Sequence, residues 1–381
     1  MRLAIVRQTY NPFGGAERFV ERALAALRDS GEPLEISLIA RRWEGEASSG
    51  ARLIRCKPFK LGRLSRDIGF AMAVRRLIAR ERFDLVQSHE RIPGCDIFRA
   101  GDGVHATWLE LRAQSLGWFG RLAQSISPWH RYTCAAEAAM FRHPALRAVI
   151  CNSNMVREDI ARRFPEIAGK LHVIHNGVDL ERFHPGLRAE HRTRLRAELG
   201  VADEVPVVLY VGSGFSRKGV PQLLEAMARP ELAGAELWVV GKDRDSVRLE
   251  REAGKKGLRV RFLGPQKDVR PWLGAADVFA LPTLYDPMPN AALEALASGL
   301  PVLCSRTCGA AELIEPGENG EVVEALDVPG IVAGLSSLLA AARDPEKGPA
   351  LRESARTAVA GLDKEAMASA LMALYTGLFT G

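Results

Sequence analysis

The sequence predicts an α/β protein made of two Rossmann-like doubly wound domains, and two observations carry this prediction. First, short apolar runs typical of buried strands alternate with longer segments of helical periodicity along most of the 381 residues. Second, the alternation forms two series, separated near residues 175–200 by a stretch that contains Gly177, Pro185 and Gly186. Strands that alternate with helices favour parallel sheets covered on both faces, so two series indicate two such domains.

The first series, residues 1–180, is assigned to an N-terminal domain. Its strands are expected at Leu3–Val6, Ile36–Ala40, Leu85–Gln87, Ala148–Cys151 and Leu171–Ile174, and its helices at Gly15–Arg28 and Ile68–Arg82. The last segment of the chain, Lys364–Phe379, has apolar residues at helical spacing, so it must dock on a surface. The spacing alone does not say which surface that is.

The second series, residues 181–363, is assigned to a C-terminal domain. Its strands are expected at Pro206–Val211, Glu236–Val240, Val260–Leu263, Val278–Leu281 and Pro301–Cys304, and its helices at Gly219–Ala228, Val269–Ala275, Asn290–Ser298 and Ala310–Ile314. In open sheets of this kind, ligands bind beyond the carboxyl ends of the strands. Functional residues are therefore expected in the loops that leave those ends.

Composition narrows the class of protein. The chain is 47% hydrophobic and 26% charged, and no apolar stretch approaches the roughly 20 residues that a membrane span needs. The apolar start of the chain ends at Arg7, which is too short for a signal peptide. Six scattered cysteines are expected to be reduced thiols, so a cytoplasmic location is expected.

Positive charge is concentrated in the first half of the chain. Residues 1–180 hold 28 Lys+Arg and 19 Asp+Glu, whereas the remainder holds 24 (52−28) and 27 (46−19). The densest part, residues 52–82, has ten basic residues interleaved with Phe59, Leu61, Leu64 and Phe70. An amphipathic basic run fits an anionic membrane surface, and a solvated helix face is the alternative. No nucleic-acid motif accompanies the run, so no nucleic-acid partner is expected.

A glycine-containing loop follows the first strand of each series. Gly14 and Gly15 open a helix whose first amides can meet an anion or a sugar oxygen, although a plain tight turn fits equally well. In the loop 212–219, Arg217 and Lys218 precede a helix and can neutralise phosphate charge. This second loop is not a Walker A loop, because Lys218 is not followed by Ser or Thr. The alternative is an exposed turn whose cations face solvent.

The loop 286–294 leads from an expected strand into an expected helix. Asp286 lies in the loop and Glu294 inside the helix, and a carboxylate can accept two hydrogen bonds from sugar or ribose hydroxyls. The amides around Asn290 and Ala291 are helix-start donors that can hold a phosphate. A turn residue and a solvated glutamate fit the charge pattern equally well.

Three further polar features are weaker. Asp102 and His105 lie in a glycine-flanked loop, where an aspartate is usually a turn residue, and His89 ends an expected strand. The pair Asp243 and Asp245 matches a short Asp-x-Asp metal motif. Nothing else in the sequence resembles a divalent-cation site with its oxygen ligands, so no metal is expected.

Taken together, the motifs resemble the retaining family-4 glycosyltransferases of the GT-B fold. The resemblance rests on Val173–Phe183, Arg217–Gly219, Asp286–Val302 and Ala311–Gly320, which occur in the order of that family. Phe13–Arg18 and Ile92–Asp96 are similar to the bacterial lipopolysaccharide core glycosyltransferases that add glucose to an inner-core heptose. The resemblance implies two Rossmann-like domains facing a cleft, with the final helix, residues 364–381, packed on the N-terminal domain.

The resemblance also implies roles for individual residues. The donor diphosphate is expected to contact Gly14, Gly15, Arg217, Lys218, Asn290 and Ala291. Glu294 is expected to bind the nucleotide ribose, and Asp286 and Asp102 are the expected catalytic residues, near the donor sugar and the acceptor. His105 and Glu17 are further candidates for contact with the acceptor or sugar.

Two positions depart from the family pattern. Asp286 stands where the family usually has Glu, and Ser213 stands where an arginine is often found. The phosphate-binding charge therefore falls on Arg217 and Lys218.

The expected activity is the retaining transfer of a hexose, glucose or a related sugar, from a nucleoside diphosphate sugar, expected to be UDP-linked, without metal or other cofactor. The expected acceptor is a lipid-linked saccharide, the lipopolysaccharide core, met by peripheral contact at the inner face of the cytoplasmic membrane. A nucleotide-sugar epimerase of the same fold and a non-catalytic sugar-nucleotide binder are the alternatives.

Overall fold

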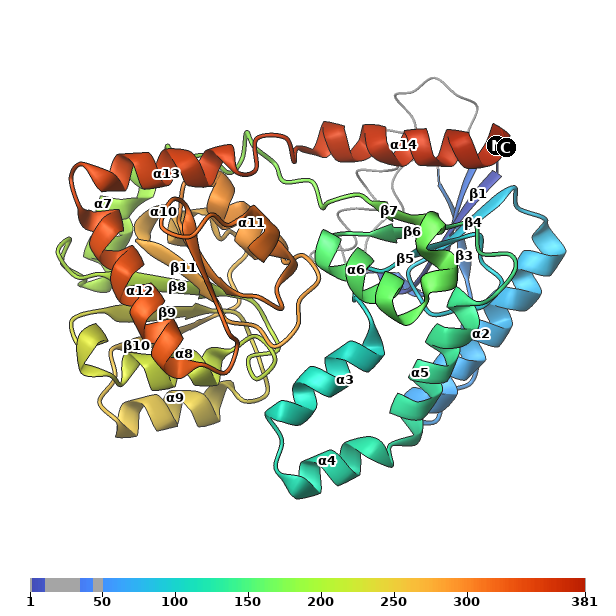
Figure 1. The fold of residues 1–381 in the computed structure, drawn as a ribbon, viewed down its shortest axis with the longest axis horizontal. Coiled ribbons are helices and arrows are strands. Elements are labelled where there is room, and N and C mark those ends of the chain that lie inside the picture. The colour runs from blue at the N-terminus through green and yellow to red at the C-terminus, as the bar shows by residue number, and fades with distance from the viewer. Residues whose placement is uncertain (1, 11–34, 44–50, 381) are drawn as a thin grey trace. The chain divides into compact units, whose positions relative to one another are not determined.

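The structure, a computed structural model, describes residues 2–10, 35–43 and 51–380 (Figure 1). The chain divides into two compact units: unit 1 contains Met1–Gly177 with Lys364–Gly381, and unit 2 contains Val178–Asp363. The sequence-based division placed the boundary after residue 180. The expected helix Gly15–Arg28, and with it the candidate residues Gly14, Gly15 and Glu17, lies outside the described residues.

Unit 1 is built on a parallel sheet whose described strands follow the order β3-β2-β1-β4-β5-β6-β7. The strands are β1 Arg2–Tyr10, β2 Glu35–Trp43, β3 Arg52–Arg55, β4 Leu85–Ser88, β5 Ile97–Arg99, β6 Ala148–Cys151 and β7 Leu171–Val173. The helices are α2 Gly62–Glu81, α3 His105–Gln114, α4 Trp118–Ser125, α5 Pro128–Phe141, α6 Asn154–Arg163, the 3₁₀ helix η1 Pro165–Lys170, and α14 Lys364–Thr380.

Each face of the unit 1 sheet has its own apolar core, because successive strand residues point to opposite faces. Ile5 of β1 packs in the cluster that includes Tyr375 of α14, whereas Val6 packs in the cluster that includes Phe70 of α2. The Tyr375 hydroxyl also donates a hydrogen bond of 2.6 Å to Oε1 of Gln87 on β4. Helix α14 therefore docks on unit 1. The expectation that Phe70 adds apolar area at a membrane is wrong, because its side chain is 1% exposed.

Unit 2 is built on a second parallel sheet with the order β10-β9-β8-β11-β12-β13. The strands are β8 Val207–Val211, β9 Glu236–Val240, β10 Val260–Gly264, β11 Val278–Leu281, β12 Val302–Ser305 and β13 Gly320–Val323. The helices are α7 Leu187–Leu199, α8 Val220–Met227, η2 Pro230–Leu232, α9 Ser246–Lys255, α10 Arg270–Ala275, α11 Asn290–Ala297, η3 Gly309–Leu313, α12 Val328–Arg343 and α13 Lys347–Thr357.

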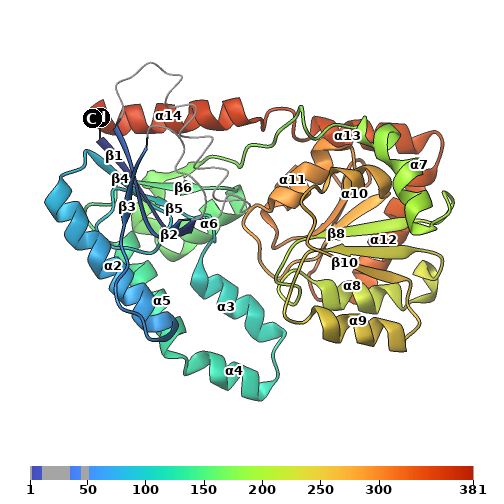
Figure 2. The same cartoon turned by 180° about the vertical axis from the view of Figure 1, so that it is seen from behind.

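Helices lie on both faces of the unit 2 sheet (Figures 1 and 2), so the strands are buried on both sides. Counted from β8, the strand order is that of the doubly wound dinucleotide-binding sheet. The predicted fold class is confirmed. In such a sheet the ligand binds where the strand order reverses, and here the reversal falls between the neighbouring strands β8 and β11. The loops that leave the carboxyl ends of these two strands are therefore the place to look for a site.

Candidate functional site

The loop after β8 is shaped by close backbone contacts that only glycine permits. Gly219 has a φ of 85°, and a Cβ atom there would lie 2.2 Å from the carbonyl oxygen of Pro282, in the loop after β11. A Cβ atom at Gly241, directly after β9, would lie 1.8 Å from the carbonyl oxygen of Gly212. The loops after β8, β9 and β11 thus meet at one edge of the sheet.

Asp243, in the loop after β9, holds the loop after β8 in place. One of its carboxylate oxygens accepts hydrogen bonds from the backbone N–H groups of Gly214, at 2.9 Å, and Phe215, at 3.2 Å. Its other oxygen accepts from the N–H of Asp245 at 2.9 Å. The first carboxylate of the Asp-x-Asp motif is therefore engaged with backbone. Among residues 2–10, 35–43 and 51–380, no three His, Cys, Asp or Glu side chains are grouped as metal ligands.

Two cations of the loop after β8 meet a carboxylate of the loop after β11. Nζ of Lys218 lies 2.9 Å from Oδ2 of Asp286, and Nη1 of Arg217 lies 3.7 Å from the same oxygen. Arg217 also donates to the backbone carbonyl of Tyr285 at 2.6 Å. Asp286 is 7% exposed, so its charge is balanced mainly by these two cations. The structure thus brings together three residues that sequence reasoning took from two separate motifs.

The backbone around Asp286 is fixed from a third loop, the one after β12. The Asp286 N–H donates to the carbonyl of Thr307 at 3.2 Å, and its carbonyl accepts from Gly309 at 2.8 Å. Cys308, between them, is buried, and burial raises the pKa of its thiol well above the ordinary value, as does its neighbour Cys304. The Cys308 thiol is therefore a packing group and not a nucleophile.

Helix α11 begins directly after this loop, at Asn290. The first N–H groups of a helix, which here include that of Ala291, find no partner within the helix and carry its partial positive charge. Glu294 lies one turn further on, on the same side of the helix as Asn290, and is half-buried. The site in unit 2 therefore offers two cations and helix-start amides, with one carboxylate beside the cations and another along the helix.

In unit 1, Asp102 lies exposed in the turn between β5 and α3. Arg91, in the loop after β4, fixes this turn by donating a hydrogen bond to the carbonyl of Gly103 at 3.0 Å. Arg91 also donates to the carboxylate of Glu137 on α5 at 2.7 Å. The nearby Glu90 is half-buried, and its partial burial raises the pKa of its carboxyl group. Sequence reasoning missed these three charged residues, although Glu90 and Arg91 directly follow a strand end that it had marked.

His105 and His89 are both buried in unit 1. The His105 ring packs between Trp108 and Trp129, and its Nε2 lies 3.1 Å from Nδ1 of His130. Burial, Arg91 and the second imidazole together lower the pKa of His105 to about 3. Burial likewise lowers the pKa of His89 well below its ordinary value. Both rings are therefore neutral at physiological pH, and the His105 ring is engaged by side chains of α3 and α5.

Comparison with known proteins supplies the family. Residues 13–182 match the family model described as Glycosyltransferase Family 4, and residues 205–341 match the model described as Glycosyl transferases group 1. The chain is 30% identical over 333 residues to the lipopolysaccharide core biosynthesis glycosyltransferase LpsE of Rhizobium meliloti, covering 86% of each chain. It is 27% identical over 328 residues to the lipopolysaccharide glucosyltransferase WaaG of Escherichia coli, covering 85% of each chain.

Solved structures share the fold along the whole chain. The crystal structure of WaaG superposes with a TM-score of 0.81 at 24% identity, covering 98% of this chain and 100% of that one. The Anabaena protein HepE, crystallised with UDP and glucose, superposes with a TM-score of 0.69 at 20% identity, covering 99% and 100%. The two parallel-sheet units and the cationic loop in unit 2 agree with the two matching family models and with the relatives that are similar over most of the chain. The chain therefore belongs to the family-4 glycosyltransferases of the GT-B fold and is a hexosyltransferase.

Proposed function

We propose that this enzyme moves a hexose, glucose or a closely related sugar, from a UDP-linked donor to a lipid-linked saccharide of the lipopolysaccharide core, with retention of the anomeric configuration. The observation that carries the proposal is the meeting of Arg217, Lys218 and Asp286 where the strand order of unit 2 reverses. Two cations beside a carboxylate suit a ligand that has a diphosphate next to sugar hydroxyls.

The donor diphosphate would lie against the loop after β8 and the start of α11. Arg217 and Lys218 now form ion pairs with Asp286, so a diphosphate that replaces this carboxylate as their partner leaves it to accept hydrogen bonds from hydroxyls of the donor sugar. Glu294, one turn along α11, would accept hydrogen bonds from the ribose hydroxyls. The nucleoside and the sugar are proposed as uridine and glucose because HepE was crystallised with UDP and glucose and WaaG is named a glucosyltransferase.

The reaction would need no divalent cation. The bond between the anomeric carbon and the diphosphate oxygen breaks, a bond to the acceptor oxygen forms on the same face, and the proton of the acceptor hydroxyl passes to the released diphosphate. The charge that develops on the leaving diphosphate is met by Arg217, Lys218 and the α11 amides, which do for it what a metal ion does elsewhere. Asp243, the nearest match to a metal ligand in the sequence, already accepts three backbone hydrogen bonds.

The acceptor would be bound by unit 1, with Asp102 as its contact to the reacting hydroxyl. Asp102 is exposed at the carboxyl end of β5, the edge where ligands of such sheets bind. The His105 ring is already engaged with His130, so Asp102 is the stronger candidate of the two. A lipopolysaccharide core acceptor is proposed because LpsE is named for lipopolysaccharide core biosynthesis and WaaG for lipopolysaccharide.

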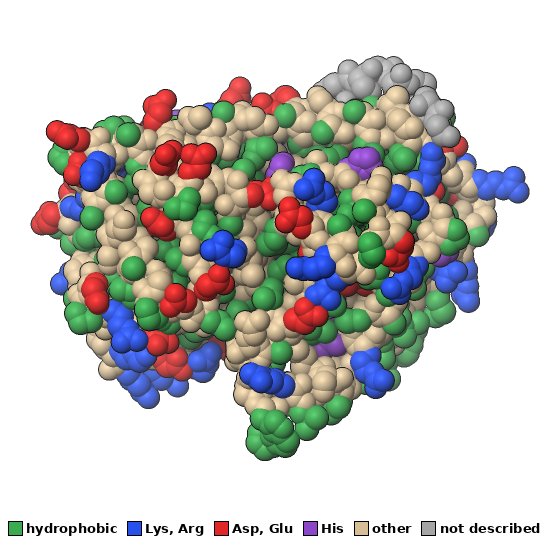
Figure 3. Space-filling view, in the orientation of Figure 1, with side chains coloured by type: hydrophobic (Ala, Val, Ile, Leu, Met, Phe, Trp, Pro, Cys, Tyr) green, Lys and Arg blue, Asp and Glu red, His purple; other side chains and the backbone are tan. Residues whose placement is uncertain are grey.

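Helix α4 would bring the enzyme to the membrane that holds such an acceptor. None of the described helices is long and apolar enough to cross a bilayer. Helix α4, however, has no buried residue and presents an apolar face to solvent: Trp118 is 67% and Phe119 77% exposed, with Leu122 and Ile126 beside them (Figure 3, lower edge). Phe59 and Leu61, which directly precede α2, are exposed as well.

Basic residues accompany this apolar surface. Arg121 lies on α4 itself, Arg112 on the preceding helix, and Arg63 of α2 lies over the ring of Trp129 at 5.8 Å, close to the end of α4. Aromatic side chains flanked by arginines suit the headgroup region of an anionic leaflet. The contact surface proposed here is therefore α4 together with the start of α2, in place of the whole run 52–82.

Product analysis tests the function directly. The protein is incubated with a panel of UDP-sugars, with and without delipidated lipopolysaccharide core acceptor, and the products are examined by mass spectrometry and proton NMR. A hexose added to the core with the donor's anomeric configuration is expected. An epimerised nucleotide sugar without transfer would favour the epimerase, and an inverted linkage would refute retention.

A further inference from the structure

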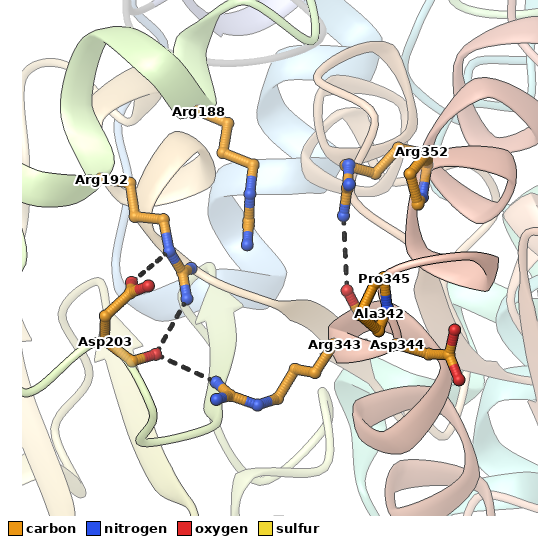
Figure 4. Close-up of a pocket in the computed structure, with 9 residues that line it drawn as sticks. Arg188, Arg192, Asp203, Ala342, Arg343, Asp344, Pro345 and Arg352 are labelled. Carbon is orange, nitrogen blue, oxygen red and sulfur yellow. Dashed lines mark hydrogen bonds and ion pairs between the residues drawn. The ribbon is translucent and has the colours of Figure 1, made fainter.

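A second cationic site lies in unit 2, at the other end of the sheet from the loop after β8 that contains Arg217 and Lys218, called the donor loop below. A cavity of about 190 Å³ opens between helices α7, α12 and α13 (Figure 4). Four arginines line it, namely Arg188, Arg192, Arg343 and Arg352. Asp277, at the bottom of this cluster, directly precedes β11, whereas Asp286 of the donor site follows the same strand. The cavity is therefore not part of the donor site.

The arginines come together because of their spacing. Arg188, Arg192 and Arg196 are four residues apart on α7, so they share one face of that helix. Arg343 is the last residue of α12, and Arg352 lies on α13, which follows it after a short turn. In Figure 4 the guanidinium groups of the four labelled arginines point toward a common space.

One buried carboxylate serves most of these cations. Asp277 has no exposed side-chain surface and lies 2.7 Å from Arg196, 2.9 Å from Arg192, 3.5 Å from Arg188 and 3.8 Å from Arg343. Arg196 and Arg192 thus take the two close positions. Arg188 and Arg343 are left at the long end of ion-pair distance, and one negative charge cannot balance four positive ones.

The two remaining acids do not remove the imbalance. Asp203 pairs with Arg192 at 2.7 Å, but its carboxylate is 78% exposed and well hydrated. The carboxylate of Asp344 points away from the arginines in Figure 4, and it accepts the N–H groups of Glu346 and Lys347 at 2.9 and 3.0 Å. Five arginines against three aspartates leave an excess of two positive charges around the cavity.

Arg188 and Arg352 keep hydrogen-bond donors for a ligand. A guanidinium has five N–H donors. Within the described part of the chain, Arg188 donates to the carbonyl of Ala276 at 3.2 Å and to Asp277 at 3.5 Å, and Arg352 donates only to the carbonyl of Ala342, at 3.3 Å. Burial and the charge of Arg192 lower the pKa of both, that of Arg188 to about 10, as expected where cations crowd together without enough counter-charge.

We propose that this cavity binds a phosphate dianion, either inorganic phosphate or the phosphoryl end of a small phosphorylated metabolite, through Arg188, Arg343 and Arg352. The planar forks of the guanidinium groups match the oxygens of a phosphate, and two negative charges would balance the excess. The cavity is several times larger than the roughly 30 Å³ that a water molecule occupies, which gives room for a phosphoryl group. The inference does not depend on the proposed donor or acceptor.

Calorimetric titration with inorganic phosphate, at constant ionic strength maintained with NaCl, tests the proposal. The titration uses the Arg217→Ala/Lys218→Ala protein, so that the donor loop cannot contribute. In this background Arg188→Gln/Arg352→Gln should weaken phosphate binding at least tenfold, because each lost hydrogen bond to a charged group is worth roughly tenfold or more. Arg194→Gln, an exposed arginine of the same helix α7, is the matched control and should change nothing.

Further arms separate the outcomes. If glycerol 3-phosphate binds more tightly than inorganic phosphate, the cavity is a site for a phosphorylated metabolite. If it binds equally or more weakly, the cavity is a site for free phosphate. If circular dichroism and melting curves show that the double variant does not fold, the single variant Arg352→Gln replaces it in the phosphate titration. Phosphate that binds no better than chloride, or a folded variant that keeps its affinity, would overturn the proposal.

Discussion

Replacing both cations of the donor loop, Arg217→Ala with Lys218→Ala, should raise the Kd for UDP at least tenfold. Hydrogen bonds to charged groups are worth about 1.5–3 kcal/mol each, so two of them set a gross loss of about 3–6 kcal/mol. The net loss is smaller, because both cations already pair with Asp286, at 2.9 Å for Lys218 and 3.7 Å for Arg217. Binding of the donor gains only the difference between pairing the cations with the diphosphate and pairing them with Asp286. A net loss of about 1.4 kcal/mol in the free energy of UDP binding corresponds to the tenfold minimum.

The same change should lower the stability of unit 2, since it leaves Asp286 buried without its cations. An unpaired buried carboxylate costs about 1–3 kcal/mol or more. Adding Asp286→Asn to the double variant should therefore restore much of the melting temperature without restoring UDP affinity. Isothermal titration with UDP and thermal melts on all three proteins measure both quantities. Unchanged UDP affinity in a folded double variant would show that this loop does not bind the diphosphate.

Four further predictions follow from the site and its surroundings. Glu294→Ala should weaken donor binding with little change in kcat, whereas Asp286→Ala should mainly lower kcat, since the proposed binding mode puts only the latter near the reacting centre. Wild-type kcat/KM in both variants would contradict the assignment. Activity should survive EDTA, and a loss restored by Mg²⁺ or Mn²⁺ would revive the Asp-x-Asp pair as metal ligands. Trp118→Ser with Phe119→Ser should reduce salt-sensitive sedimentation with anionic liposomes, and equal sedimentation of variant and parent would exclude α4 as the contact. The pKa of His105 is about 3 in the folded protein and about 6.5 in the unfolded chain, so the unfolded chain binds an extra proton between these values and stability falls as the pH drops below 6.5. After allowance for solvent screening, His105→Phe should remove about 1 kcal/mol of the stability that urea unfolding shows to be lost between pH 7 and pH 5. An unchanged loss in the variant would contradict the low pKa.

Most buried strands and the motif loops were predictable because their signals are local, whereas the buried strand β5 was missed because it is only three residues long. Each expected strand of unit 2 overlaps a strand of the structure, and Arg217, Lys218 and Asp286 were singled out before their contact was known. The short edge strands β3 and β13 were missed, since four residues at the side of a sheet carry little apolar pattern. Helix α4 was missed although its apolar residues recur at helical spacing, because eight residues give only two turns of that pattern.

Other features depend on contacts between distant parts of the chain. The N–H groups of Gly214 and Phe215 donate to Asp243 only because the loops after β8 and β9 lie side by side, so the Asp-x-Asp match alone could not reveal this structural role. The apolar spacing of α14 defined one face of a helix but not its partner. The arginine cluster around Asp277 draws on three helices and a strand end, and no single sequence window contains it.

The docking of α14 constrains the order in which the protein can fold during synthesis. Unit 2 is continuous in sequence, so all of its strands have left the ribosome once Asp363 has emerged. Unit 1 must wait longer, because the face of its sheet that carries Leu3 and Ile5 is covered by Leu371 and Tyr375 of the last helix. Until then the apolar residues that pack against α14 lack this partner on a nascent chain, and unpartnered apolar surface of this kind aggregates or recruits chaperones. The first half of the chain to be made is thus the last to be completed.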